Sequence, residues 1–173
     1  MKVLYYDERL KELENNYKWN DALYYLEGLY EQNNAIDILN SLVGFSWYYL
    51  IEGPIDSRKF EHDKNEDALF IWKKYIDIGS RIAFQNQFFN FISGYTLSLH
   101  GFLINSEYEK QGILFMKRCF NMEDNALLKQ LALHFLKNEK AKKYIPLMNG
   151  RELCKELFNG TSLLEKYFNE IYN

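Results

Sequence analysis

The chain has 173 residues, a formal net charge of −3 and a pI near 5.7. This length fits one domain with a substantial hydrophobic core. The weak acidity gives no general reason to expect binding to nucleic acid or to an anionic membrane. Because only two Pro and nine Gly interrupt the sequence, we expect long helices.

The N-terminus, the cysteines and the hydropathy pattern favour a cytoplasmic protein. The apolar stretch before Asp7 is too short for a secretory signal. Cys119 and Cys154 form no CxxC pair, which favours free thiols in a reducing compartment. Residues 82–106 contain no Asp, Glu, Lys or Arg, but Gln, Asn, Ser and Thr recur among them, whereas a membrane-spanning helix needs about 20 predominantly apolar residues. We therefore expect a helix packed inside a soluble protein.

Apolar residues recur at three- and four-residue steps through nearly the whole sequence, which is the pattern of amphipathic helices. In the first half of the chain this pattern predicts helices over 7–15, 20–32, 36–51 and 67–82. The third of these ends before Gly53-Pro54, a pair that stops helices. The polar stretch that follows predicts an exposed loop over 53–65.

The second half of the chain continues the helical pattern. It predicts an uncharged helix after a junction at 85–87, then helices over 106–120, 126–137, 151–158 and 162–172. Ser106 with Glu109, and Ser162 with Glu165, match the capping box, in which the Ser and Glu side chains bond each other's backbone amides at a helix start. Turns are predicted at "NMEDN" and near Pro146.

These elements predict an all-α fold, since no stretch alternates for long in the manner of a half-buried strand. Eight or nine helices joined by short turns imply antiparallel neighbours, as in an irregular bundle or a short α-solenoid. Trp19 and Ala22 resemble part of a tetratricopeptide helix, but no 34-residue period recurs. We expect a single domain over 1–173.

The ionisable residues give no pattern that is typical of an enzyme. His100 has neither a nucleophile nor an orienting carboxylate on its own helix, so we expect it to be largely buried and structural. His62 lies among carboxylates, but without zinc-type spacing, and a solvated loop explains it better. The lysines of 137–143 favour a solvated turn over a phosphate site. We expect no catalysis, no cofactor, no metal and no nucleic-acid binding.

Acidic residues are concentrated near the N-terminus: residues 1–53 carry nine acidic and four basic residues, a net charge of −5. On the helix over 20–32, tyrosines and carboxylates fall opposite the apolar stripe. Exposed tyrosines framed by carboxylates, here Tyr24 and Tyr25, are typical of a surface that binds a basic partner, although an ordinary solvated acidic face also explains the pattern. We predict a partner-binding face made of Asp21, Tyr24, Glu27 and Glu31, extended by Glu8 and Glu12.

Segments of the second half follow one another in a recognisable order: "GYTLSLHGFL", "LFMKRCF", the turn "NMEDN", "ALLKQLALHFL" and "FNGTSLLEKYFNEIYN". This order resembles a group of small all-helical immunity proteins that accompany bacterial polymorphic toxins, including those of contact-dependent growth inhibition. Where that family often has Pro, this chain has Gly101 and Glu123. The matched positions are Gly94, Tyr95, Ser98, Leu99, His100, Asp124, Asn125, Phe158, Gly160, Tyr167 and Phe168.

The resemblance implies a cytoplasmic, non-catalytic protein that binds one cognate toxin domain and blocks it. Toxin domains of this kind are often nucleases, and an endoribonuclease of the EndoU type is one target that the resemblance implies. A nuclease cleft must be basic to hold phosphates, so an acidic inhibitor would complement it. The alternative is a tetratricopeptide-like adaptor that binds a peptide or a regulatory protein in a groove.

Overall fold

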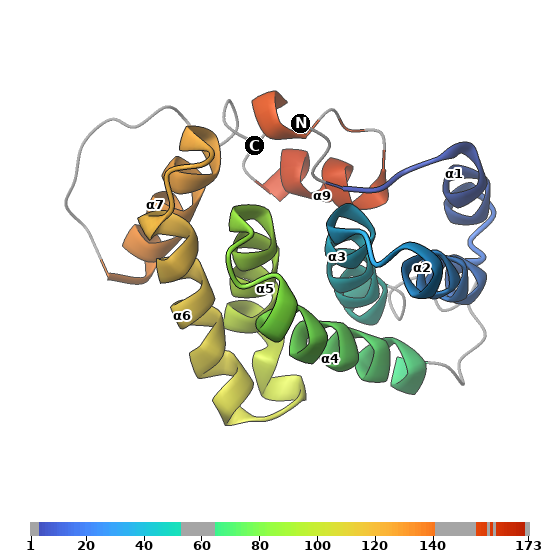
Figure 1. Cartoon of the computed structure of the whole chain (residues 1–173), viewed down its shortest axis with the longest axis horizontal. Coiled ribbons are helices and arrows are strands. Elements are labelled where there is room, and N and C mark those ends of the chain that lie inside the picture. The colour runs from blue at the N-terminus through green and yellow to red at the C-terminus, as the bar shows by residue number, and fades with distance from the viewer. Residues whose placement is uncertain (1–3, 53–64, 141–154, 159, 161, 172–173) are drawn as a thin grey trace. The chain divides into compact units, whose positions relative to one another are not determined.

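The computed structural model describes residues 4–52, 65–140, 155–158, 160 and 162–171 (Figure 1). The regular secondary structure of these residues is entirely helical, which confirms the all-α prediction. The chain divides into two compact units, Met1–Phe84 and Gln85–Asn173. The single domain over 1–173 stays a prediction. Most of the predicted 53–65 loop, His62, the turn near Pro146 and Cys154 lie outside the described residues.

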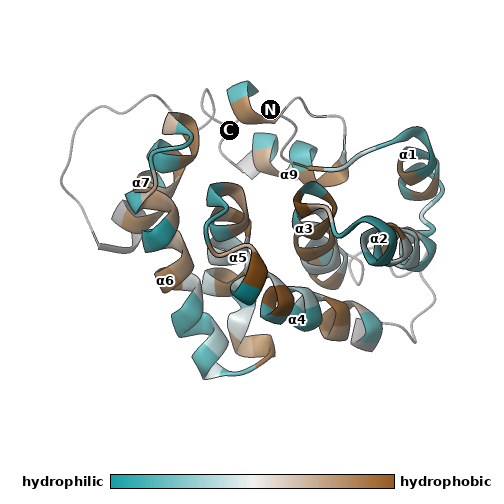
Figure 2. Cartoon of the chain, in the orientation of Figure 1, coloured by the Kyte–Doolittle hydropathy of each residue, from teal (hydrophilic) through white to brown (hydrophobic). Residues whose placement is uncertain are grey.

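In the first unit, consecutive helices fold back on one another around α3. Its helices are α1 (Glu8–Asn15), α2 (Trp19–Asn33), α3 (Ile36–Glu52) and α4 (Asn65–Ile82). Each agrees with its predicted range to within two residues. Both α2 and α4 pack against α3. In Figure 2, α1 is mostly teal, whereas brown, hydrophobic residues recur along α3.

The core of the first unit forms because α3 has almost no polar side. Every residue from Ile38 to Trp47 is buried. The indole of Trp19, at the start of α2, packs against the rings of Phe45, Tyr48 and Tyr49 near the end of α3, with centroid distances of 6.2, 5.7 and 5.2 Å. These ring contacts pair opposite ends of α2 and α3, so the two helices are antiparallel.

The second unit contains the remaining elements. These are α5 (Gln87–His100), the short 3-10 helix η2 (Gly101–Leu103), α6 (Ser106–Asn121), α7 (Ala126–Lys140) and α9 (Leu163–Ile171). Of these, α5 and α6 form a helical hairpin. Residues 155–157, within the predicted helix over 151–158, are also helical. The predicted junction at 85–87 is confirmed, since α4 ends at Ile82 and Asn86 caps α5 through a bond from the amide of Phe89.

Helices α5 and α6 approach each other closely because glycines face the backbone of the neighbouring segment. A Cβ added to Gly94 would lie 2.7 Å from the backbone nitrogen of Met116, and one added to Gly101 would lie 2.6 Å from that of Glu109. On α6, a Cβ at Gly112 would meet the backbone of Ser98. Backbone atoms cannot rotate away as side chains do, so these positions require glycine.

One predicted capping box is confirmed and the other is wrong. At the start of α9, the amide of Glu165 donates to the Ser162 hydroxyl and the amide of Ser162 donates to the Glu165 carboxylate. Ser106, in contrast, is already the first helical residue of α6, and the cap is Asn105. The side-chain carbonyl oxygen of Asn105 accepts the backbone amides of Glu107 and Tyr108, so Asn105 and not Ser106 caps α6.

An aromatic cluster joins α9 to α5. The ring of Phe168 stacks on Phe158 with a centroid distance of 4.9 Å and contacts Phe91 and Tyr95 at 5.8 and 5.1 Å. The hydroxyls of Tyr95 and Tyr167 are 3.3 Å apart. Several of the positions matched to the immunity proteins therefore belong to the core of this unit.

His100 differs from the prediction, because it is half-buried and not largely buried. It is the last residue of α5, where the chain turns into η2, and its ring contacts Phe102. Burial lowers the pKa of its imidazole. The polar side chains in the middle of the uncharged helix are the buried ones, among them Asn90, Ser93 and Thr96.

Candidate functional site

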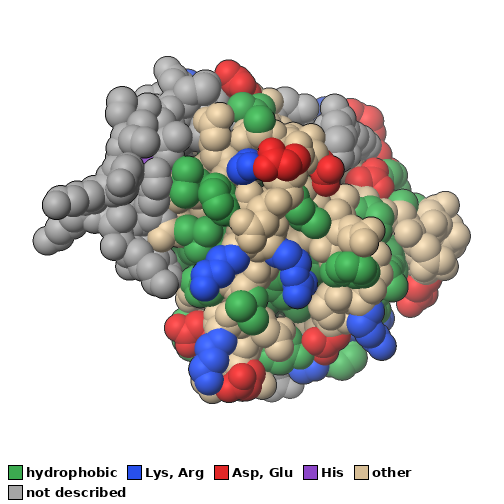
Figure 3. Space-filling view, turned by 60° about the vertical axis from the view of Figure 1, so that its left-hand side comes forward, with side chains coloured by type: hydrophobic (Ala, Val, Ile, Leu, Met, Phe, Trp, Pro, Cys, Tyr) green, Lys and Arg blue, Asp and Glu red, His purple; other side chains and the backbone are tan. Residues whose placement is uncertain are grey.

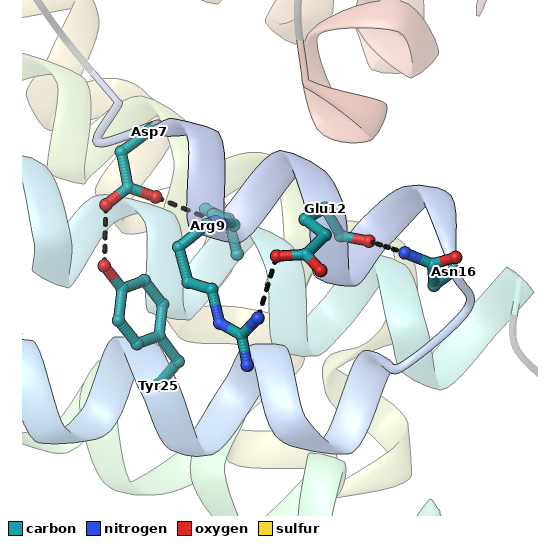
Figure 4. Close-up of polar contacts among 6 residues, drawn as sticks. Asp7, Arg9, Glu12, Asn16 and Tyr25 are labelled. Atoms are coloured by element: carbon teal, nitrogen blue, oxygen red, sulfur yellow. Dashed lines mark hydrogen bonds and ion pairs between the residues drawn. The ribbon is translucent and has the colours of Figure 1, made fainter.

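The acidic N-terminal region is built around Asp7, which joins α1 to α2 (Figure 4). One carboxylate oxygen of Asp7 caps α1 by accepting the amide of Leu10 at 2.8 Å. The other oxygen accepts the hydroxyls of Tyr5 and Tyr25, both at 2.6 Å. Asp7 therefore holds the entry segment, α1 and α2 together.

The hydrogen bonds of Asp7 also decide its charge state. Burial raises the pKa of the carboxyl, but the bonds from Tyr25, Tyr5 and the backbone amides outweigh it and lower the pKa below 3.8. Because these bonds favour the ionised form, Asp7 is a carboxylate that supports the structure and is not poised to exchange protons near neutral pH.

Asp7→Asn is expected to reduce the free energy of unfolding by about 2 kcal/mol at neutral pH, since two charge-assisted bonds become neutral ones while the cap is kept. A lowered carboxyl pKa stabilises the fold above its unfolded value of 3.8, and this stabilisation is lost as pH falls through the folded value. The difference between wild type and variant should therefore shrink progressively as pH falls below about 5, as measured by urea unfolding. A constant difference would contradict this role.

Glu8 and Glu12, the predicted extension of the binding face, are exposed on α1. Each lies one turn from a basic residue, with Arg9 2.8 Å from Glu12 (Figure 4) and Lys11 3.3 Å from Glu8. Exposed pairs of this kind contribute less than about 1 kcal/mol to stability. They do reduce the net negative charge that α1 presents.

Glu27 and Tyr24 connect α2 to α4 within the first unit. The carboxylate of Glu27 lies 2.9 Å from the ammonium of Lys74, and only 16% of the Glu27 side chain is exposed. Burial lowers the Lys74 pKa, but the bond to Glu27 outweighs it, so the pKa is raised. The Tyr24 hydroxyl donates to Asp67 at 2.8 Å. Glu27 is thus committed to an internal ion pair, which makes it a weaker candidate for partner contact than its neighbours.

The prediction that Tyr25 is exposed beside Tyr24 is wrong. Its side chain is half-buried and its hydroxyl bonds Asp7. Although Tyr25 is adjacent to Tyr24 in sequence, the turn of the helix directs it toward α1. Tyr24 remains exposed over 49% of its surface, so one tyrosine and not a pair is presented to solvent.

The remaining predicted residues on α2 are Asp21, Tyr24 and Glu31, and together with Gly28 they form what we call the α2 outer face. They follow one another at three- and four-residue steps, and therefore lie along one side of the helix. Asp21 and Glu31 are exposed, and neither side chain forms a hydrogen bond or an ion pair with another residue that the structure describes. The α2 outer face thus presents a tyrosine ring and two carboxylates that no described cation neutralises.

Gly28→Ala is expected to stabilise the chain by about 0.5–1 kcal/mol, because alanine favours a helix interior over glycine. A Cβ added at Gly28 would meet no atom of the described residues within 4 Å, so no clash offsets the gain. Thermal unfolding should show a Tm raised by roughly 2–4 °C. An unchanged or lower Tm would contradict the open space assigned to this position.

Large hydrophobic side chains are also exposed in both units. Phe70 on α4 is 67% exposed. In the second unit the exposed set is Leu99, Phe102, Leu103 and Leu114. On the face that Figure 3 shows, hydrophobic side chains lie in several groups among charged side chains and other surface atoms. Leu99 follows the buried residues Ile92 and Tyr95 at helical steps, so its sequence pattern predicts burial and gives no sign of its exposure.

None of the helices in the described part of the chain is long and apolar enough to cross a membrane. Among the same residues, no group of three or more His, Cys, Asp or Glu side chains is placed to hold a metal ion. Comparison with known proteins gives no match to a family model, to a curated protein or to a solved structure.

Proposed function

We propose that this chain is an immunity protein, which binds a cognate toxin domain through the α2 outer face and blocks its activity. The observation that carries the proposal is the exposure of Tyr24 between Asp21 and Glu31, two carboxylates without a described counter-ion. Tyrosine at the centre of an interface contributes large contact area at low entropic cost. The toxin is the partner because of the resemblance of the second unit to immunity proteins.

The division of roles between the two units supports this proposal. Positions that carry the resemblance have structural contacts in the second unit: Gly94 allows the close approach of α6, Asn125 caps α7, and Phe168 fills the aromatic core. Such positions support a shared scaffold. A surface that recognises one partner is expected elsewhere, and the α2 outer face lies in the first unit.

Charge complementarity indicates the kind of toxin. A domain that cleaves nucleic acid needs a basic cleft to hold phosphates, and an acidic face would be attracted to it and would accelerate association. An endoribonuclease of the EndoU type fits this description. The inhibitor itself would act in the cytoplasm, where it meets the toxin, and would need no catalytic group or cofactor.

Co-expression tests the proposal. The C-terminal domain of the protein encoded immediately upstream should stop growth when it is produced alone, and this chain should restore growth. The two should co-purify as a complex in which nuclease activity is undetectable. Growth arrest that this chain does not relieve would reject the immunity function.

A second outcome would favour the adaptor alternative. An inhibitor must hold its toxin almost fully inactive, whereas an adaptor that recognises a peptide binds reversibly, often with micromolar affinity. If this chain bound a peptide segment of the upstream protein and left its activity intact, the tetratricopeptide-like interpretation would replace the immunity function.

A further inference from the structure

We infer that a Lys or Arg side chain of the partner docks over Gly28, against the ring of Tyr24 and beside the carboxylate of Glu31. This inference rests on the proposed function, because it specifies what the α2 outer face binds. It assigns a contact to Gly28, whose added Cβ would meet none of the described residues.

The environment of Gly28 differs from that of two helical glycines in the second unit. Gly94 and Gly112 are each required by a neighbouring backbone, as their added Cβ atoms would clash with α6 and α5 respectively. At Gly28 an added Cβ would meet no described atom within 4 Å. Glycine in the middle of a helix is nevertheless unfavourable relative to alanine. Packing among the described residues therefore does not explain this glycine, whereas close approach by another molecule would.

The neighbours of Gly28 have the chemistry of a cation site. Tyr24 lies one turn before it and Glu31 one turn after it, on the same side of α2. The bond from the Tyr24 hydroxyl to Asp67 fixes the ring on the surface before any partner arrives. A cation docked over Gly28 would lie within one helical turn of both the Tyr24 ring and the Glu31 carboxylate, the two groups that attract a positive charge.

Charge decides between a basic and an apolar side chain. An apolar group over Gly28 would remove water from Glu31 without replacing its hydrogen bonds, which is unfavourable for an ionised carboxylate. A guanidinium or ammonium group supplies both the donors and the opposite charge. Glycine adds the space, because the absent Cβ lets the long aliphatic stem of Lys or Arg lie against the helix backbone.

Gly28→Gln tests the inference, because glutamine fills the space over the helix without changing the charge. The variant should keep a Tm at least equal to that of wild type, since no described atom lies within 4 Å of a Cβ at this position and glutamine favours a helix interior over glycine. Its dissociation constant for the upstream toxin domain should rise about tenfold or more. Ala126→Gln is the matched control, because Ala126 is an exposed helical residue of the second unit, and it should bind as wild type does.

A double-mutant cycle identifies the docked cation. Alanine substitutions of the surface Lys and Arg residues of the toxin domain are each combined with Glu31→Gln. For one of these toxin residues, the combined effect of the two substitutions on the dissociation constant should differ from the product of their separate effects by about threefold or more.

The outcomes separate the inference from the proposed function. If wild type does not bind the toxin domain, the proposed function fails. If wild type binds and Gly28→Gln binds equally well, or Ala126→Gln weakens binding as much, only the docking inference is overturned. Strict additivity at every toxin Lys and Arg would overturn the assignment of a cation.

Discussion

Gly112→Ala is expected to lower the free energy of unfolding by about 2 kcal/mol. The added Cβ would clash with the backbone nitrogen of Ser98 and would lie 2.8 Å from the carbonyl carbon of Leu97. Overpacking against a backbone that cannot move aside typically costs about 3 kcal/mol of folding free energy at the upper end of its range. The better helix propensity of alanine offsets at most about 1 kcal/mol of this cost. The loss therefore outweighs the gain, although alanine is the better helix former.

Thermal and urea unfolding measure this effect. The Tm of Gly112→Ala should fall by roughly 4–8 °C. Gln111→Ala is the control, because Gln111 is the adjacent exposed residue of α6, and its Tm should change little. If Gly112→Ala unfolds at or above the wild-type temperature, α5 and α6 do not approach as closely as the structure describes. The opposite signs expected for Gly112 and Gly28 make the two substitutions a matched pair.

Asp21→Lys combined with Glu31→Lys is expected to slow association with the toxin domain about tenfold or more at low salt. Both carboxylates are exposed and have no described counter-ion, so they contribute fully to the long-range field that steers a basic partner. Reversing them removes the attraction, and the association rate should also depend less on salt. Stopped-flow measurements over a range of ionic strength would determine both quantities.

The control for this charge reversal is Glu109→Lys with Glu170→Lys, which changes the net charge equally on exposed residues of the second unit. Its association rate should stay within about threefold of wild type, because steering depends on where charge lies as well as on its total. Equal slowing by both double variants would show that net charge alone matters, and would contradict a specific role for the α2 outer face.

The helices of this chain could be predicted because their signals are local. Apolar residues at three- and four-residue steps fixed α1 to α4 to within two residues, and Gly53-Pro54 marked the region where α3 ends. The capping box of Ser162 and Glu165 involves residues three apart, so the sequence contains both partners. The cap of α6 is Asn105 and not Ser106. Both residue types cap helices, and the helical pattern alone does not choose between two adjacent candidates.

The candidate binding face was predicted only in part, because its details depend on contacts between helices. Lys74 neutralises Glu27 across 47 residues of sequence, and no local pattern indicates that pairing. Similarly, the Tyr25 hydroxyl bonds Asp7, the cap of α1, and the side chain is half-buried. Its neighbour Tyr24 stays exposed. Glycine itself is ambiguous in sequence: Gly28 faces open space and Gly112 faces a backbone, and only the packing distinguishes them.

Isothermal titration calorimetry of this chain against the upstream toxin domain tests the central claim most directly. Neutralisation requires a dissociation constant in the nanomolar range or below, about −12 kcal/mol or stronger, with one chain bound per toxin domain. The variant with Asp21→Lys and Glu31→Lys, titrated in parallel, should bind more weakly. Micromolar or undetectable binding of wild type, or equal affinity of the two chains, would contradict inhibition through the α2 outer face.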